Sequence, residues 1–146
     1  MSLESWAEAG WIKPHTSSRR EIADLLGVAD RDLETSQIEN LTTDWKLIIS
    51  YKAALHYATA ALAAAGHRVS RERHHYLTIQ SLAYTIGIDR DTVNLLDVIR
   101  VKRAVSDYER AGTVSDSEAD EAFSLARAIR EKVETWVREH HPDLIQ

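Results

Sequence analysis

Apolar residues recur every three or four positions along most of the chain, which predicts a succession of amphipathic helices. Capping signals mark where several of them begin. Ser18 and Ser115 are each followed three residues later by glutamate, and Thr42 or Thr43 precedes a long apolar segment. Gly27 is expected to break or bend the first helix. The pattern predicts helices over residues 18–40, 44–65, 70–87, 91–112 and 115–141.

These ranges predict an all-α fold: an antiparallel up-and-down helical bundle of four long helices, with a shorter N-terminal helical segment. Residues 44–65 are expected to form the central helix, because their apolar side chains cover more than half of its circumference and its alanines allow close packing. A chain of 146 residues with five Gly and two Pro suits one helical domain. We expect that domain to span residues 1–146, with residues 1–28 forming a docked arm and a short helix anchored by Trp6 and Trp11.

Composition narrows the classes of function. The chain has no cysteine, which excludes disulfides and thiolate metal sites. It shows neither a signal-peptide pattern nor an apolar stretch long enough to span a bilayer. We therefore expect a cytoplasmic protein that does not associate with a membrane. The formal net charge of -5 argues against adhesion to nucleic acid over the whole surface. Any such role must depend on a local basic surface.

The usual catalytic and metal-binding patterns are not found. No two histidines have the i, i+4 spacing that places two ligands on one helix face, and no nucleophile elbow, P-loop or dinucleotide fingerprint occurs. His56, in the middle of the central helix, is expected to be a hydrogen-bonded core or interface histidine. We therefore expect no metal, no cofactor and no standard catalytic set.

The strongest functional lead is the helix over residues 91–112. A helical projection assigns one face to the core and the opposite face to solvent. The expected core residues are Leu95, Val98, Val101, Val105 and Tyr108, and the expected binding face carries Arg100, Arg103, Asp107 and Arg110. Arg71, Arg73 and His75 form a second basic cluster that would widen this surface. The alternative is a solvated face in which Arg103 and Asp107 form an ordinary ion pair.

Three segments resemble a known family. They are DWKLIISYKAALHYATAALAAAG, RHHYLTIQSLA and the run from DVIRVKRAV to ETWV, which together cover about two thirds of the chain. In this order they resemble the HEPN superfamily of small prokaryotic helical proteins. The resemblance implies an up-and-down bundle that commonly dimerises. It also implies a ribonuclease toxin, a partner of a small nucleotidyltransferase, or a protein that binds nucleotide or RNA without cleavage.

The ribonuclease motif of that superfamily, an arginine followed four to six residues later by histidine, is matched only in part. Arg103 fits the arginine, but Tyr108 to Arg110 occupy the histidine positions, as in the R-x-x-x-D-Y form of some relatives. We therefore expect a homodimer that binds nucleotide, RNA or a nucleotidyltransferase-type partner through the arginine face, in toxin–antitoxin or defence systems, without strong catalysis. The alternatives are an active ribonuclease toxin with a divergent site and a purely structural dimerisation module.

Overall fold

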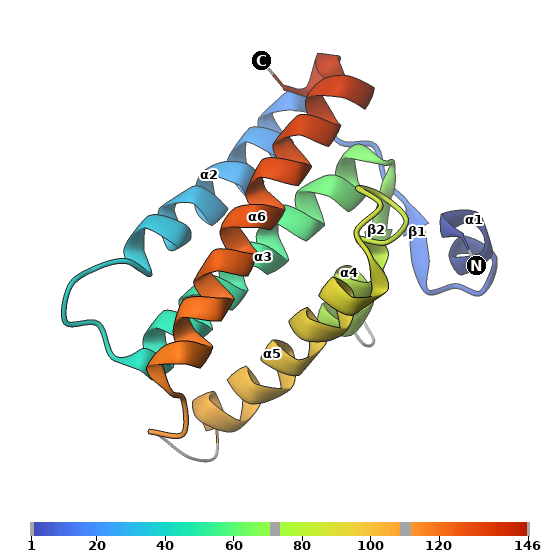
Figure 1. Cartoon of the computed structure of the whole chain (residues 1–146). Coiled ribbons are helices and arrows are strands. Elements are labelled where there is room, and N and C mark those ends of the chain that lie inside the picture. Colours follow the sequence, from blue (N-terminus) through green and yellow to red (C-terminus); the bar gives the residue numbers. More distant parts are fainter. Residues whose placement is uncertain (1, 71–73, 109–111, 146) are drawn as a thin grey trace.

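The computed structural model describes residues 2–70, 74–108 and 112–145, and it confirms the all-α bundle (Figure 1). The four long helices are α2 (Arg19–Thr35), α3 (Thr43–Ala64), α5 (Arg90–Tyr108) and α6 (Asp116–His140). The shorter elements are α1 (Leu3–Glu8), β1 (Ile12–Pro14), β2 (His67–Val69), α4 (His74–Ser81) and the 3-10 helix η1 (Pro142–Leu144).

Helix α3 is the centre of the bundle, as its apolar circumference predicts. It contacts α2, α4, α5 and α6, and its alanines from Ala53 to Ala64 are buried. Thr42 caps its N-terminus and Gly66, with φ of 90°, follows its C-cap. Among the described helices, only α3 is long and apolar enough to span a bilayer, contrary to our expectation that no segment is. Because 72% of that apolar window is buried inside the bundle, α3 is the core helix.

Helix α2 runs without a break through Gly27, so the predicted interruption is wrong. Its buried residues recur at spacings of four, three and four, and they pack against α3: Ile22, Leu26, Ala29 and Leu33. Burial of this stripe outweighs the roughly 1 kcal/mol that a glycine costs within a helix. Residues 19–28, which were expected to form only a short helix of the N-terminal segment, therefore belong to a full helix of the bundle.

Helix α4 is shorter than the predicted helix over 70–87, because it ends at Ser81. Beyond Ser81 the backbone hydrogen bonds join residues three positions apart instead of four. Leu82 N–H donates to the Ile79 carbonyl, and Tyr84 N–H donates to the Ser81 carbonyl. The Ser81 hydroxyl also donates to the Thr78 carbonyl at 2.6 Å. Such local hydroxyl bonds compete with the α-helical pattern, which explains the early end.

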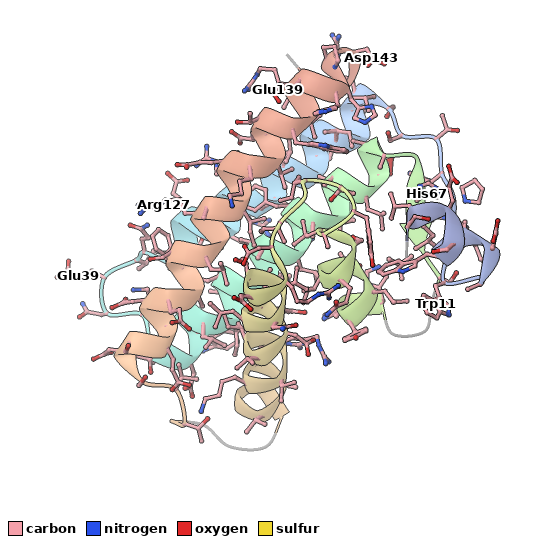
Figure 2. All side chains as sticks on the ribbon, turned by 45° about the vertical axis from the view of Figure 1, so that its right-hand side comes forward. Trp11, Glu39, His67, Arg127, Glu139 and Asp143 are labelled. Carbon is pink, nitrogen blue, oxygen red and sulfur yellow. The ribbon has the colours of Figure 1, made fainter. Side chains whose placement is uncertain are left out.

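A two-stranded antiparallel sheet, absent from our sequence expectations, joins the N-terminal segment to the end of α3. Ile12 pairs with Val69 and Pro14 with His67. The adjoining small core contains Trp6, whose ring centroid lies 5.8 Å from that of Trp11 and 5.3 Å from that of Tyr84. Figure 2 shows Trp11 and His67 at this end of the molecule and Glu39 at the other. Strands of three residues, separated by more than fifty positions, leave no recognisable pattern in the sequence.

A polar cluster joins helices α2, α3 and α6. Tyr57, which is fully buried, donates its hydroxyl to Asp30 of α2. Arg130 of α6 places its Nε 3.3 Å from Asp30 Oδ1 and 3.2 Å from Glu134 Oε1. The cluster therefore ties α2, α3 and α6 together at one level of the bundle.

Candidate functional site

Helix α5 presents its faces in the opposite sense to the sequence prediction. Val98 and Val101, which were expected in the core, are 63% and 50% exposed. The buried stripe is instead Val93, Leu96 and Ile99. Arg100 and Arg103 are consequently half-buried and contact aromatic rings of α3 and α4. The arginines form the wall of a site between helices and are not a freely solvated face.

Arg103 meets residues from two other helices. Its Nη2 lies 3.1 Å from Nδ1 of His75 on α4, and its guanidinium carbon lies 5.2 Å from the ring centroid of Tyr51 on α3. The Tyr51 hydroxyl also lies 3.1 Å from His75 Nδ1. An imidazole therefore does stand beside Arg103, although the sequence places no histidine on α5 after it. The motif positions on α5 lack a histidine, but α4 supplies one from a different part of the sequence.

These contacts determine which nitrogen of His75 carries the proton. A guanidinium only donates hydrogen bonds, so Nδ1 of His75 must accept, and the neutral ring carries its proton on Nε2. Burial lowers the pKa of His75, and the positive charge of Arg103 lowers it further. Burial likewise raises the pKa of Tyr51 to about 12, although Arg103 opposes this. At neutral pH, His75 therefore offers Nε2–H as a donor and Tyr51 keeps its proton.

Removing the guanidinium should raise the pKa of His75. In the Arg103→Gln variant we expect a higher imidazole pKa than in the native protein, yet still below 6.5, because burial remains the larger cause. Because folding favours the neutral form of His75, this residue contributes fully to stability at pH values above its pKa in the unfolded chain. That contribution is lost as the pH falls through its pKa in the folded protein. Long-range ¹H–¹⁵N spectra of the imidazoles measure both pKa and tautomer. A native His75 that titrates at or above 6.5 with its proton on Nδ1 would contradict this description.

Arg100 takes part in a neighbouring arrangement. Its Nε donates to Oδ1 of Asp97 at 2.7 Å, and its guanidinium carbon lies 5.6 Å from the ring centroid of Tyr76. A shallow hollow beside it is also lined by Arg103 and the two adjacent histidines, His74 and His75. Asp97 neutralises part of the charge of Arg100. Arg103 lines the same hollow, so both guanidiniums are candidates for contact with an anion.

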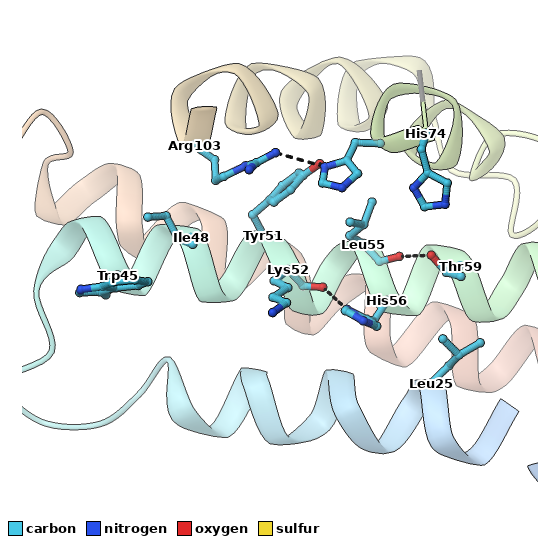
Figure 3. A pocket seen from close by; sticks show the side chains of 11 residues that line it. Leu25, Trp45, Ile48, Tyr51, Lys52, Leu55, His56, Thr59, His74 and Arg103 are labelled. Carbon is cyan, nitrogen blue, oxygen red and sulfur yellow. Dashed lines mark hydrogen bonds between the residues drawn. The ribbon is translucent and has the colours of Figure 1, made fainter. Parts of the chain in front are cut away.

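A pocket of about 530 Å³ opens beside Arg103, between α2, α3, α4 and α5 (Figure 3). Its apolar and aromatic lining comprises Leu25, Trp45, Ile48, Tyr51 and Leu55, and its polar lining comprises Lys52, His56, Thr59, His74, His75 and Arg103. The described residues that line it include no carboxylate. The pocket thus combines apolar walls with one lysine, one arginine and three imidazoles in a protein whose net charge is -5.

His56 is held differently from His75. Its Nδ1 lies 2.9 Å from the carbonyl oxygen of Lys52, one turn earlier in α3, so Nδ1 donates and Nε2 is the acceptor of the neutral ring. This agrees with the expectation of a hydrogen-bonded histidine, but the bond is to its own helix and the residue lines the pocket. The pocket therefore presents one imidazole donor, from His75, and one imidazole acceptor, from His56.

The structure brings together only some of the residues that the sequence singled out. Arg103 and His75 share the pocket, and Arg100 lies in the adjacent hollow. Arg71, Arg73 and Arg110 lie outside the described residues, as do the side chains of Asp107 and Tyr108. Sequence reasoning missed the pocket residues of the central helix. Their signal is the helical spacing of one face that mixes aromatic, cationic and apolar side chains: Trp45, Ile48, Lys52, His56 and Thr59.

Comparison with known proteins identifies the family. The sequence matches the HEPN domain over residues 22–136, which covers α3 and α5 entirely and most of α2 and α6. The chain therefore belongs to the HEPN family. A search of curated proteins finds no match. Within the described part of the chain, no three histidine or carboxylate side chains are grouped to hold a metal ion.

Proposed function

We propose that this HEPN protein binds a phosphate-bearing nucleotide or RNA in the pocket beside Arg103. The observation that carries the proposal is the lining itself, whose described residues include Lys52, His56, His74, His75 and Arg103 but no carboxylate. Such a local excess of positive charge on an acidic protein attracts anions. The ligand would then lie in a cavity between helices, not on the exposed arginine face expected from the sequence. Arg103 and His75 line this cavity, and Arg100 lines the adjacent hollow.

Each group has a defined task in this proposal. Arg103 and Lys52 contact phosphate oxygens, and His75 adds a neutral hydrogen bond through Nε2–H. Trp45, which is 54% exposed at one end of the pocket, offers a flat surface on which a base stacks. The apolar side chains of Ile48 and Leu55 exclude water from the floor. A ligand with both a phosphate and an aromatic ring uses all of these features.

Binding should depend steeply on salt. A fluorescently labelled single-stranded RNA, titrated at 50 and 200 mM salt, is expected to bind more weakly at the higher concentration, because contact with about two or three phosphates gives a slope of roughly -0.7 per phosphate on logarithmic axes. Fluorescence anisotropy measures this directly. Absence of binding to RNA and to nucleotides at the lower salt would overturn the proposal and leave a structural dimerisation module as the remaining function.

We also propose a homodimer. Proteins of this family commonly dimerise and pair with nucleotidyltransferases. In this chain Val98 and Val101 lie one turn apart and outward-facing on α5, where they would gain from burial against a second copy. Light scattering at tens of micromolar is expected to give twice the chain mass of 16.5 kDa, and a Val98→Asp, Val101→Asp variant a smaller average mass. A native protein of single-chain mass would refute the dimer.

The broader role follows from the family. We propose that the dimer acts in a cytoplasmic toxin–antitoxin or defence system, where a nucleotidyltransferase-type protein is its partner. The family is associated with such roles in general. A pull-down with the protein encoded next to it tests the partner, and retention of a nucleotidyltransferase supports it. If only RNA is retained, the RNA-binding role stands without that partner.

Ribonuclease activity is a second candidate, favoured by two imidazoles in the pocket: His75 contacts Arg103, and His56, whose Nδ1 is bonded to the Lys52 carbonyl, would accept a proton through Nε2. His56 would take the proton of a ribose 2′-hydroxyl. The leaving oxygen, however, needs an acid. Neither Arg103 nor Tyr51, with a pKa of about 12, gives up a proton near pH 7, and the lowered pKa of His75 keeps its ring neutral there. We therefore expect no appreciable cleavage of mixed RNA. Metal-independent cleavage that vanishes in both His56→Ala and Arg103→Ala variants would favour the second candidate.

A further inference from the structure

A smaller pocket of about 240 Å³ adjoins the first one. The two share Leu25, Thr59 and His74, so one wall belongs to both. The second pocket continues past the end of α3 to the strand β2, and its other lining residues are His15, Glu21, Leu62, Ala63, His67, Arg68, Val69 and Thr78. Figure 2 places His67 near the strands and α1, at the end of the molecule away from Glu39.

The second pocket contains hydrogen-bonding capacity that the protein itself does not use. Nδ1 of His67 is buried, and the described residues offer it no hydrogen-bond partner. A buried ring nitrogen without a partner is costly and calls for a bound group or a water. The carboxylate of Glu21 accepts from His15 Nε2 at 2.8 and 2.7 Å through its two oxygens, which retain further lone pairs for another donor.

Most of the remaining walls are apolar or already committed, and Arg68 and His74 add two further polar side chains. Leu62 and Val69 are buried apolar residues. Thr59 and Thr78 donate their hydroxyl protons within their own helices, to the carbonyls of Leu55 and His74. Apolar side chains between one buried, unpartnered imidazole nitrogen and one carboxylate suit a planar heterocycle with both donors and acceptors on its edge.

We propose that this second pocket is a nucleobase subsite, which extends the pocket beside Arg103 into a site for at least two nucleotide units of a single strand. The inference rests on the proposed function, because the phosphate contacts at Arg103 hold the ligand. Tyr51 and Thr59 are eight residues apart on α3, about 12 Å along the helix. One base stacks on Trp45, and the next enters the space between Glu21 and His67. A ligand that fills both pockets is longer than a nucleoside monophosphate.

The experiment compares ligands with equal charge. The probes are the dinucleotide pApA and two analogues, one lacking the 5′ base and the other lacking the 3′ base, with affinities measured by calorimetry. We expect each abasic analogue to bind about tenfold more weakly than pApA. The His67→Ala variant should bind pApA at least threefold more weakly than the native protein does. Its affinity for the analogue that lacks the nucleobase expected in the second pocket should be unchanged. Glu21→Gln, which keeps its contact with His15, should act like His67→Ala and serves if that variant fails to fold.

Controls separate the two proposals. Arg103→Gln should weaken all three ligands, and Arg138→Ala on α6, which contributes no residue to either pocket, should weaken none. If pApA binds and Arg103→Gln weakens it, but His67→Ala and Glu21→Gln have no effect, the base subsite is refuted and the proposed function stands. If none of the three ligands binds to the native protein, the proposed function itself fails.

Discussion

Replacement of Arg103 by alanine is expected to weaken the binding of single-stranded RNA at least tenfold at 50 mM salt. Arg103 is the only arginine that lines the pocket among the described residues, and its position is set by His75 and by the ring of Tyr51. Loss of its charge-assisted bonds to phosphate costs roughly 1.5–3 kcal/mol, which is about one to two orders of magnitude in affinity. Fluorescence anisotropy with a labelled RNA measures the change.

Stability should change far less than affinity in this variant. The contact of Arg103 with Tyr51 is worth about 1 kcal/mol or less at a half-exposed position. Arg103→Lys keeps the charge but loses the planar fork, so its affinity should fall between those of the native protein and Arg103→Ala. Arg138→Ala, an exposed arginine of α6, is the matched control. Equal losses of affinity in Arg138→Ala and Arg103→Ala would show that general charge, not this pocket, binds RNA.

Replacement of Tyr57 by alanine is expected to lower the free energy of unfolding by about 3–5 kcal/mol, the range measured when a large aromatic side chain is removed from a core. Tyr57 is fully buried in the middle of α3, and its hydroxyl bonds to Asp30 of α2. Alanine leaves a cavity where α2, α3 and α6 meet. Urea denaturation followed by circular dichroism measures the loss. A change below 1 kcal/mol would show that the three helices do not depend on this side chain.

The Tyr57→Phe variant separates packing from hydrogen bonding. It removes only the hydroxyl, so we expect a smaller loss of about 0.5–1.5 kcal/mol. Burial and the Asp30 carboxylate raise the pKa of Tyr57 above its ordinary value. Because an acid with a raised folded pKa stabilises the protein only below its unfolded pKa, stability should fall as pH rises above 10. Tyr57→Phe should reduce that alkaline loss, and an unchanged alkaline profile would contradict the assignment.

Local signals in the sequence predict most of the helices. The Ser115 and Glu118 side chains form the predicted capping box of α6, and Ser18 caps α2 through Glu21 N–H. These signals depend on residues close together in the chain, so they can be recognised without knowledge of the fold. The interruption at Gly27 was wrong for the opposite reason, because burial against α3 decides the continuity of α2 and depends on a distant segment.

The faces of α5 show a second limit. This helix carries two apolar stripes, one through Val93, Leu96 and Ile99 and another through Val98 and Val101. Periodicity alone does not decide between them, since each recurs at helical spacing. Packing against α3 and α4 buries the first stripe, and this turns Arg100 and Arg103 toward Tyr76 and Tyr51. The sequence singled out Arg100 and Arg103, but it placed them on a solvent-facing side of α5 and not beside Tyr76 and Tyr51.

The pocket itself could not be derived from the sequence, because its members come from four helices. Arg103 and His75 are 28 positions apart, and no local pattern links them. Trp45, Lys52 and His56 recur at helical spacing on one face of α3. Because the apolar residues of this helix cover more than half of its circumference, the pattern indicated a core helix and not the wall of a pocket. Only the packing of α4 and α5 against the same stretch of α3 brings these side chains around one cavity.

The pocket beside Arg103 is proposed to bind a phosphate-bearing nucleotide or RNA. The most direct test is a set of ¹H–¹⁵N spectra of the labelled protein, recorded as single-stranded RNA is added at 50 mM salt. We predict that the indole signal of Trp45 and the imidazole signals of His56 and His75 shift together and return toward their starting positions at 200 mM salt. Shifts confined to the outer side of α5 around Val98 and Val101, with these three signals unmoved, would contradict the claim.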